Sequence, residues 1–326
     1  MSQRLRSIAL AAILAWAVPA LAQDEALPEP LGLEQALGFT DGHPRTQLDP
    51  AQALALPRRL PLYLACHELA FGAAAIGDDA RNRPLDALLN PVDAQRLEIL
   101  VRFLDTLLAD LSFSRYSEAM AVAYIQFDRA SIRRDLGQFS ELRVADLAAT
   151  YQEVRRNRSG AETAQRLTRA LLAQALNRPD SLPRDLVAPQ LPPLPDPLPD
   201  IKTLIAGAEK GNQALAERKA ADPAMGRVLN LELRQQALEL LLRLQALAAA
   251  ADGAAAETAM RDLKLDQSRV LYEYEAVADL GYSMSQQTKA RLDEQRVAYC
   301  QALTWAELQA LQGRPMWPQA AQGETP

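Results

Sequence analysis

The sequence contains few of the residues from which sheets and catalytic sites are built. Aromatic residues make up 5% of its 326 residues, and it has only 14 glycines and two histidines. Leucine and alanine dominate while β-branched residues are scarce, a composition typical of long helices. The net charge is −6, from 35 basic and 41 acidic residues, so no general basic field exists that could hold nucleic acid.

Motifs of catalysis and metal binding are also missing. The two histidines, His43 and His67, fall in different predicted elements. Cys66, His67 and Glu68 are consecutive, but consecutive residues point in different directions on a helix and do not converge on a metal. The sequence has no phosphate-binding loop and no nucleophile elbow. We therefore expect no enzyme, no catalytic residues, no metal site and no cofactor.

One apolar run stands apart, at the start of the sequence. Two arginines precede an apolar stretch over residues 8–18, and Ala20-Leu21-Ala22 supplies a small-x-small cleavage pattern. The stretch is too short to span a bilayer, so we predict a secretory signal peptide over residues 1–22 and an exported protein. No later stretch approaches the ~20 apolar residues that a spanning helix needs.

Only two cysteines are present, Cys66 and Cys300, each within a helix-like stretch. An exported compartment permits a disulfide, which would tie the first helical segment to the last. The alternative is two buried thiols that pack as small hydrophobic groups. The sequence does not decide between them, and we lean towards the unpaired thiols.

Two long stretches carry apolar residues at alternating spacings of four and three, which is the heptad pattern of coiled coils. The first begins after Pro91 and has its seam at Leu97, Val101, Leu104, Leu108 and Leu111, resumed at Val122, Ile125, Ile132 and Leu136. The second follows Pro223 and has its seam at Leu233, Ala237, Leu240, Leu244 and Leu247, continued at Leu263, Val270, Tyr274 and Val277.

Both stretches end in Asp-Leu-Gly, and another helical stretch follows each triplet. The triplets are Asp135, Leu136, Gly137 and Asp279, Leu280, Gly281. A helical hairpin must reverse within a few residues, and glycine adopts backbone angles that other residues resist. We therefore predict two antiparallel hairpins that turn near the two glycines. The leucines either belong to ordinary buried helix caps or present exposed apolar knobs to a partner.

A proline-rich stretch divides the chain into two halves. Eight prolines fall between residues 179 and 200, which excludes helix and predicts a semi-rigid connector. The predicted segments are short helices over 23–90, a hairpin over 91–178, the connector over 179–200, a second hairpin segment over 201–315 and a disordered tail over 316–326.

The helical stretch that follows Gly137 in the first hairpin has a basic face, formed by Arg155, Arg156, Arg158, Arg166 and Arg169 and interrupted by Glu162. We interpret this face as solvated. A docking surface for an acidic partner is the alternative.

This order of features resembles the TolC-like outer-membrane efflux proteins, over about residues 31–315. Those proteins have two tandem repeats, each with a Leu-x-x-Ala-Leu helix, an Asn-Pro and a long coiled-coil hairpin whose tip carries Leu-Gly or Val-Gly. The matching residues here are Leu33 to Leu37 with His43-Pro44, Leu204 to Ala208 with Asn212-Gln213, the two Asp-Leu-Gly triplets and the proline-rich connector. The resemblance implies a periplasmic or outer-membrane-associated duct component. It also implies a trimeric homo-oligomer that docks a periplasmic adaptor of an efflux or secretion system through residues 135–137 and 279–281.

One departure from the family pattern limits the expected fold. Family members insert two β-strands into each repeat, and three subunits close these strands into a membrane barrel. Neither residues 41–91 nor 213–231 contain the ~9–11 residues of alternating pattern that a membrane strand needs. We therefore predict an all-α fold of two tandem coiled-coil hairpins without barrel strands. A soluble periplasmic scaffold, derived from such a duct but no longer a channel, is the alternative function.

Overall fold

The computed structural model describes residues 27–49, 52–53, 56, 58–72, 84–273 and 280–318. The predicted signal peptide, Asp279 and most of the predicted tail lie outside these residues. The described elements are α1 (Leu33–Gly38), the 3₁₀ helices η1 (Pro44–Gln47) and η2 (Pro84–Leu88), α3 (Cys66–Phe71), α4 (Pro91–Asp135), α5 (Glu141–Ala175), α6 (Ile201–Gly211), α7 (Gln213–Ala221), α8 (Pro223–Glu273) and α9 (Leu280–Leu311).

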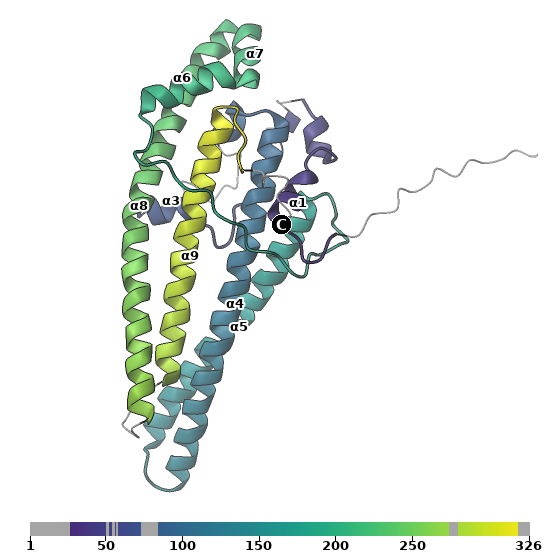
Figure 1. Ribbon diagram of the computed structural model, residues 1–326. Coiled ribbons are helices and arrows are strands. Elements are labelled where there is room, and N and C mark those ends of the chain that lie inside the picture. Colours follow the sequence, from purple (N-terminus) through teal and green to yellow (C-terminus); the bar gives the residue numbers. More distant parts are fainter. Residues whose placement is uncertain are drawn as a thin grey trace, which may run out of the picture.

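Four long helices form two antiparallel hairpins that lie side by side (Figure 1). Hairpin 1 consists of α4 and α5, and hairpin 2 consists of α8 and α9. The hairpins meet through α4 and α9, so the four helices follow the order α8, α9, α4, α5, with α8 and α5 at the two edges. Within the described residues the only β-pairing is an isolated parallel bridge between Leu31 and Leu186. The predicted all-α fold with two long hairpins is confirmed.

Local sequence sets the ends of the long helices. Asn90 caps α4 by accepting a hydrogen bond from the Asp93 backbone N–H at 2.7 Å, with Pro91 at the first helical position. The return helices end alike, because a residue with positive φ follows each one and is followed in turn by Arg-Pro. These residues are Asn177, with φ 57°, after α5 and Gly313, with φ 65°, after α9. Both conformations close the carbonyl ends of the helices.

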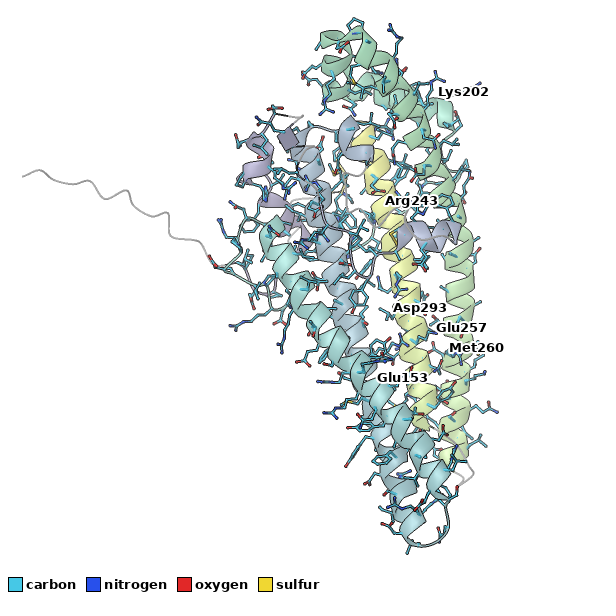
Figure 2. The ribbon with its side chains drawn as sticks, turned by 180° about the vertical axis from the view of Figure 1, so that it is seen from behind. Glu153, Lys202, Arg243, Glu257, Met260 and Asp293 are labelled. Carbon is cyan, nitrogen blue, oxygen red and sulfur yellow. A yellow bond between two sulfur atoms is a disulfide. The ribbon has the colours of Figure 1, made fainter. Side chains whose placement is uncertain are left out.

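The main core lies between the halves of the hairpins distant from the turns. In α8 the predicted seam is correct, since Leu233, Ala237, Leu240, Leu244 and Leu247 are all fully buried. In the same region α4 is buried on nearly every side over residues 94–109, because α5, α9, α1 and η1 all pack against it. Arg243 of α8, labelled in Figure 2, lies in this region. It forms an ion pair with Glu307 of α9.

The seam predicted for the turn-proximal halves is wrong at most positions, although Val122 of α4 lies close to Gly281 of α9. In α4 the helix face in contact with neighbours carries Ala123 and Ala130, which are 7% and 1% exposed, whereas Ile125 and Ile132 are 48% and 55% exposed. In α8 the buried residue is Leu265, while Leu263 and Val270 are exposed. Tyr274 and Val277 lie outside the described residues. The larger apolar residues therefore face outward where the heptad pattern alone placed them inward.

The segment over residues 58–66 is held against α4 by hydrogen bonds to two buried side chains of that helix. Arg102 of α4, itself buried, donates to the carbonyl oxygens of Arg59 and Leu60. Asp105, one turn further along α4, accepts hydrogen bonds from the backbone N–H groups of residues 62, 63 and 64 at 2.8, 2.7 and 3.1 Å. Burial raises the pKa of the Asp105 carboxyl, and these three donors act against that shift.

Cys66 follows this segment and forms a disulfide with Cys300 of α9, with the two Cα atoms 5.2 Å apart. Of the two alternatives that the sequence left open, the structure has the disulfide and not the unpaired thiols. The bridge connects the part of the chain held by hairpin 1 to hairpin 2. The proline-rich connector runs across the helices in extended form, and its Leu191, Leu194 and Leu198 pack against the core (Figure 1).

Candidate docking surface at the hairpin tips

The turn of hairpin 1 is a fully capped reversal. Gly137 has φ +70°, its N–H donates to the Arg134 carbonyl, and the Gln138 N–H donates to the Arg133 carbonyl, each at 2.8 Å. This pair of bonds is the Schellman motif that closes a helix at glycine. Ser140 then caps α5 by accepting from the Arg143 N–H at 3.3 Å. The prediction that Gly137 supplies the backbone geometry of the turn agrees with this structure.

Apolar side chains remain exposed around this capped turn. Leu136 is 67% exposed, and Leu142, at the start of α5, is 81% exposed. Ile125 and Ile132 of α4 and its C-cap residue Leu136 follow one another at spacings of seven and four, and we call these three residues the tip stripe. The heptad spacing places the stripe along one face of the helix, and exposure shows that α5 and α9 leave it uncovered.

Charged groups surround the stripe at its end. Arg134 forms an ion pair with Asp135 at 2.8 Å, and the Arg133 guanidinium lies 5.3 Å from the centre of the Phe139 ring. Asp135 and Arg134 are both exposed, so this pair contributes little to stability. The tip therefore combines a capped backbone turn, an exposed apolar stripe and neighbouring charged groups.

The corresponding region of hairpin 2 is built differently. Leu280 is half-buried and begins α9, and Gly281 lies inside the first turn of that helix rather than at a reversal. A Cβ atom on Gly281 would lie 2.8 Å from one methyl carbon of Val122 on α4. Hairpin 2 does turn near Gly281, because α8 ends at Glu273 and α9 begins at Leu280, but Gly281 itself belongs to the helix and does not have the positive φ of Gly137. Its hydrogen side chain permits close approach of the two hairpins.

Further contacts hold this end of hairpin 2 against itself and against hairpin 1. Ser268 and Ser283 share a hydrogen bond of 2.7 Å across α8 and α9, and Thr288 donates to the Glu118 carboxylate of α4. Val122 lies 13 residues before the end of α4, which is roughly 20 Å of helix. Figure 1 shows the α4–α5 turn extending beyond the described ends of α8 and α9. Among the described residues, the tip of hairpin 1 therefore projects beyond hairpin 2, whereas the described end of hairpin 2 packs against α4.

A second exposed stripe follows the edge helix α8. We call it the edge stripe, and its members are Leu231, Leu238, Leu242, Leu263 and Val270, which are 69%, 39%, 44%, 72% and 50% exposed. Positions 231, 238 and 242 each precede a buried seam residue by two positions, a step of about 200° that places them on the opposite side of the helix. Sequence reasoning placed Leu263 and Val270 in the core seam and missed this second face. Its signal was present, because the same spacing of seven and four runs through Leu231, Leu238 and Leu242.

The basic face of α5 is largely neutralised within the chain. Arg169 binds Asp110 of α4 through two nitrogens, at 2.5 and 2.9 Å, while Arg158 and Arg166 both contact Glu162, at 3.3 and 2.9 Å. These pairs favour the solvated helix face over a docking site for an acidic partner.

Neither histidine takes part in a metal cluster in the described part of the chain, where no group of three or more His, Cys, Asp or Glu side chains could hold an ion. His67 stacks edge-on against Phe71, with the ring centres 4.9 Å apart. None of the described helices combines the length and the apolar character needed to cross a membrane.

No protein-family model matches this chain, and no curated protein matches it in sequence. Over most of its length the chain is similar to two solved structures. One is a membrane protein from Pseudomonas aeruginosa, at 14% identity and a TM-score of 0.47, covering 89% of this chain and 91% of that one. The other is the open state of the MtrE outer membrane channel from Neisseria gonorrhoeae, at 12% identity and a TM-score of 0.41, covering 87% and 89%.

Proposed function

We propose that this protein is an exported hairpin component of an efflux or secretion assembly and that it docks a periplasmic adaptor through the tip of hairpin 1. The observation that carries the proposal is the tip itself. Helices of 45 and 35 residues, roughly 68 and 53 Å long, hold a capped turn at their far end. The tip stripe lies open to solvent beside that turn.

The chemistry of the stripe indicates the kind of partner. Ile125, Ile132 and Leu136 repeat at heptad spacing, so they fit the grooves of a partner that is itself a coiled coil. Because Gly137 and Ser140 fix the turn before any partner arrives, docking loses little conformational entropy. The sequence resemblance to TolC-like proteins supports an adaptor as this partner.

We also propose that the protein acts as a homo-oligomer, a trimer as the resemblance implies. The four-helix layer has open edges at α8 and α5, so copies joined head to tail place the α8 edge of one against the α5 edge of the next. The edge stripe supplies apolar surface on the α8 side. On the α5 side, Leu142 and Leu167 are exposed. Such a contact covers the edge stripe of α8, which is exposed to solvent in the single chain.

Site-specific photo-crosslinking in the native host tests the docking proposal. A photoreactive residue at position 136 is expected to form an adduct with a periplasmic adaptor that contains a helical hairpin. The matched control is position 225, since Met225 is 49% exposed but lies at the opposite end of α8. Adducts at position 136 with no such protein, or equal adaptor adducts at both positions, would contradict the proposal.

Measuring the native mass of two variants tests the oligomer separately from adaptor docking. Leu263→Glu places a charge in the edge stripe and is expected to shift the mature protein from a trimer to a monomer, whereas Leu136→Glu is expected to leave the mass unchanged. A wild-type protein that is monomeric at all concentrations would contradict the oligomer. Alkaline washing of envelope fractions separates the two candidate functions. If washing releases the protein as a monomer and position 136 still forms the adaptor adduct, the soluble scaffold is favoured over a duct component.

A further inference from the structure

A cavity of about 460 Å³ lies beside η1, where the first turns of α4 meet the last turn of α5. Residues 58 and 59, at the start of the segment that α4 holds, close one side of it. Its volume falls within the range of about 300–1,000 Å³ that is usual for small-molecule sites. The charged and titratable side chains that line it are His43, Arg45, Arg58, Arg59, Glu98 and Arg102.

Buried polar side chains give this cavity a fixed floor. Gln95 is 1% exposed and spans two walls, because its Nε2 donates to the Ala175 carbonyl at 2.8 Å and its Oε1 accepts from Arg58 at 3.1 Å. Arg102 is 2% exposed, and its Nε donates to Glu98 at 2.7 Å. These bonds hold the floor in place before any ligand arrives, which is the preorganisation that a binding site needs.

Positive charge exceeds negative charge in this cavity. Four guanidinium groups line it, against the carboxylate of Glu98. Asp86 contacts Arg58 at 3.5 Å and supplies a second carboxylate. Among the described residues at the cavity, these four positive groups stand against two negative ones, an excess of two positive charges in a partly enclosed space. Charges act more strongly there than at an open surface, because less water screens them.

The other groups at the cavity do not offset this excess. His43 donates through Nε2 to the Gln174 carbonyl at 3.3 Å and accepts at Nδ1 from the Arg45 N–H at 3.1 Å, an arrangement that fits the neutral imidazole. Two carbonyls in the last turn of α5, those of Gln174 and Ala175, accept hydrogen bonds from His43 and Gln95. These two carbonyls are therefore already hydrogen-bonded before an anion enters the cavity.

We propose that this cavity binds a small molecule bearing a multiply charged oxyanion group, either a phosphate ester or a polycarboxylate. Guanidinium groups bind such oxyanions through paired, charge-assisted hydrogen bonds. The volume leaves room for a molecule larger than a bare phosphate ion. The site is independent of the hairpin tip, which lies at the other end of α4. Binding here and docking there can therefore succeed or fail separately.

Calorimetry on the mature protein at constant ionic strength tests this proposal, with pyrophosphate and citrate as probes and chloride as the reference anion. We expect saturable binding of one probe molecule per chain. Arg59→Gln is the first variant, because Arg59 is exposed and has no side-chain ion pair in the described part of the chain. It should weaken binding about tenfold, the effect of one charge-assisted hydrogen bond, and leave the melting temperature unchanged. The matched control is Arg156→Gln, an exposed arginine of α5 outside this cavity, which should bind like wild type.

Vesicles distinguish a free anion from a lipid headgroup. Binding to phosphatidylglycerol vesicles but not to phosphatidylcholine vesicles, displaced by pyrophosphate and lost in Arg59→Gln, would identify a headgroup as the source of the same chemistry. Saturable probe binding without vesicle binding would identify a free molecule. No saturable binding in the millimolar range by folded wild-type protein would overturn the proposal. Equal weakening by Arg59→Gln and Arg156→Gln would also overturn it, because the attraction would then be nonspecific.

Discussion

The two hairpins carry the same triplet at corresponding places, yet the triplet has different roles in each. In hairpin 1 the glycine has positive φ and ends α4 in a free turn. In hairpin 2 the glycine is inside α9 and allows Val122 of hairpin 1 to approach. A short motif therefore fixes a residue type without fixing its environment. The environment depends on which neighbouring helix the residue meets.

The largest contrast we expect lies between buried and exposed seam positions. Leu240→Ala in α8 removes a fully buried side chain and should lower the free energy of unfolding by about 3–5 kcal/mol. Ile132→Ala in α4, at a position the heptad pattern also assigns to a seam, should change it by no more than about 0.5 kcal/mol, because that side chain is 55% exposed. Urea unfolding followed by circular dichroism measures both. Comparable losses would show that Ile132 is covered in solution.

Much of the fold was predictable because regular patterns determine it. The proline-rich connector, the helix starts after Pro91 and Pro223, and the seam from Leu233 to Leu247 all follow from local sequence. The turn-proximal halves were not predictable in the same way. Two faces of α4 have heptad spacing there, one with Ala123 and Ala130 and one with larger residues. Close approach between helices selects the alanines, and no single-helix pattern contains that contact.

The candidate sites show the same division. Gly137 and Leu136 could be placed at a turn from sequence, because a capped reversal is local. The contact between Gly281 and Val122 joins residues far apart in the chain, so nothing near Gly281 indicates it. The arginine-lined cavity likewise gathers Arg45, Arg59 and Arg102 from three separate segments.

The disulfide tests how far the two hairpins depend on one another. Cys66 and Cys300 are 234 residues apart, so the bridge restricts the unfolded chain strongly. Replacing both with serine should lower the free energy of unfolding by about 2–5 kcal/mol. Reduction of the wild type should give the same loss, whereas reductant should not affect the double variant. A loss confined to hydrogen exchange in α3 would show that the hairpins hold together without it.

The two tip glycines provide a matched pair for a double-mutant cycle. Gly281→Ala should cost about 1–3 kcal/mol, because its Cβ would overlap Val122. Gly137→Ala should cost about 1–2 kcal/mol for a different reason, since alanine resists positive φ and nothing lies within 4 Å of the added atom. Adding Val122→Ala should offset the first loss and leave the second unchanged. If the losses in unfolding free energy simply add when Val122→Ala is combined with either glycine variant, the hairpins do not meet at Gly281.

The smallest effect we expect concerns the corners where the short helices meet the return helices. His43 caps η1 and donates to the Gln174 carbonyl, and Asn212 caps α7 and donates to the Leu311 carbonyl at 3.1 Å. Only the first corner can titrate. Burial lowers the pKa of His43, with Arg45 and Arg58 acting in the same direction, while the bond to Gln174 and the charge of Glu98 act against it.

A lowered pKa means that the unfolded chain binds this proton more readily than the folded one. The stability contributed by neutral His43 is therefore complete above about pH 6.5, the ordinary value for histidine, and is lost as the pH falls through that value towards the lowered one. His43→Asn copies the second corner, because asparagine can accept from the Arg45 N–H and donate to Gln174. It should flatten the dependence of unfolding free energy on pH below 6.5 relative to the wild type. An unchanged slope in His43→Asn would show that His43 is as accessible to protons in the folded chain as in the unfolded one.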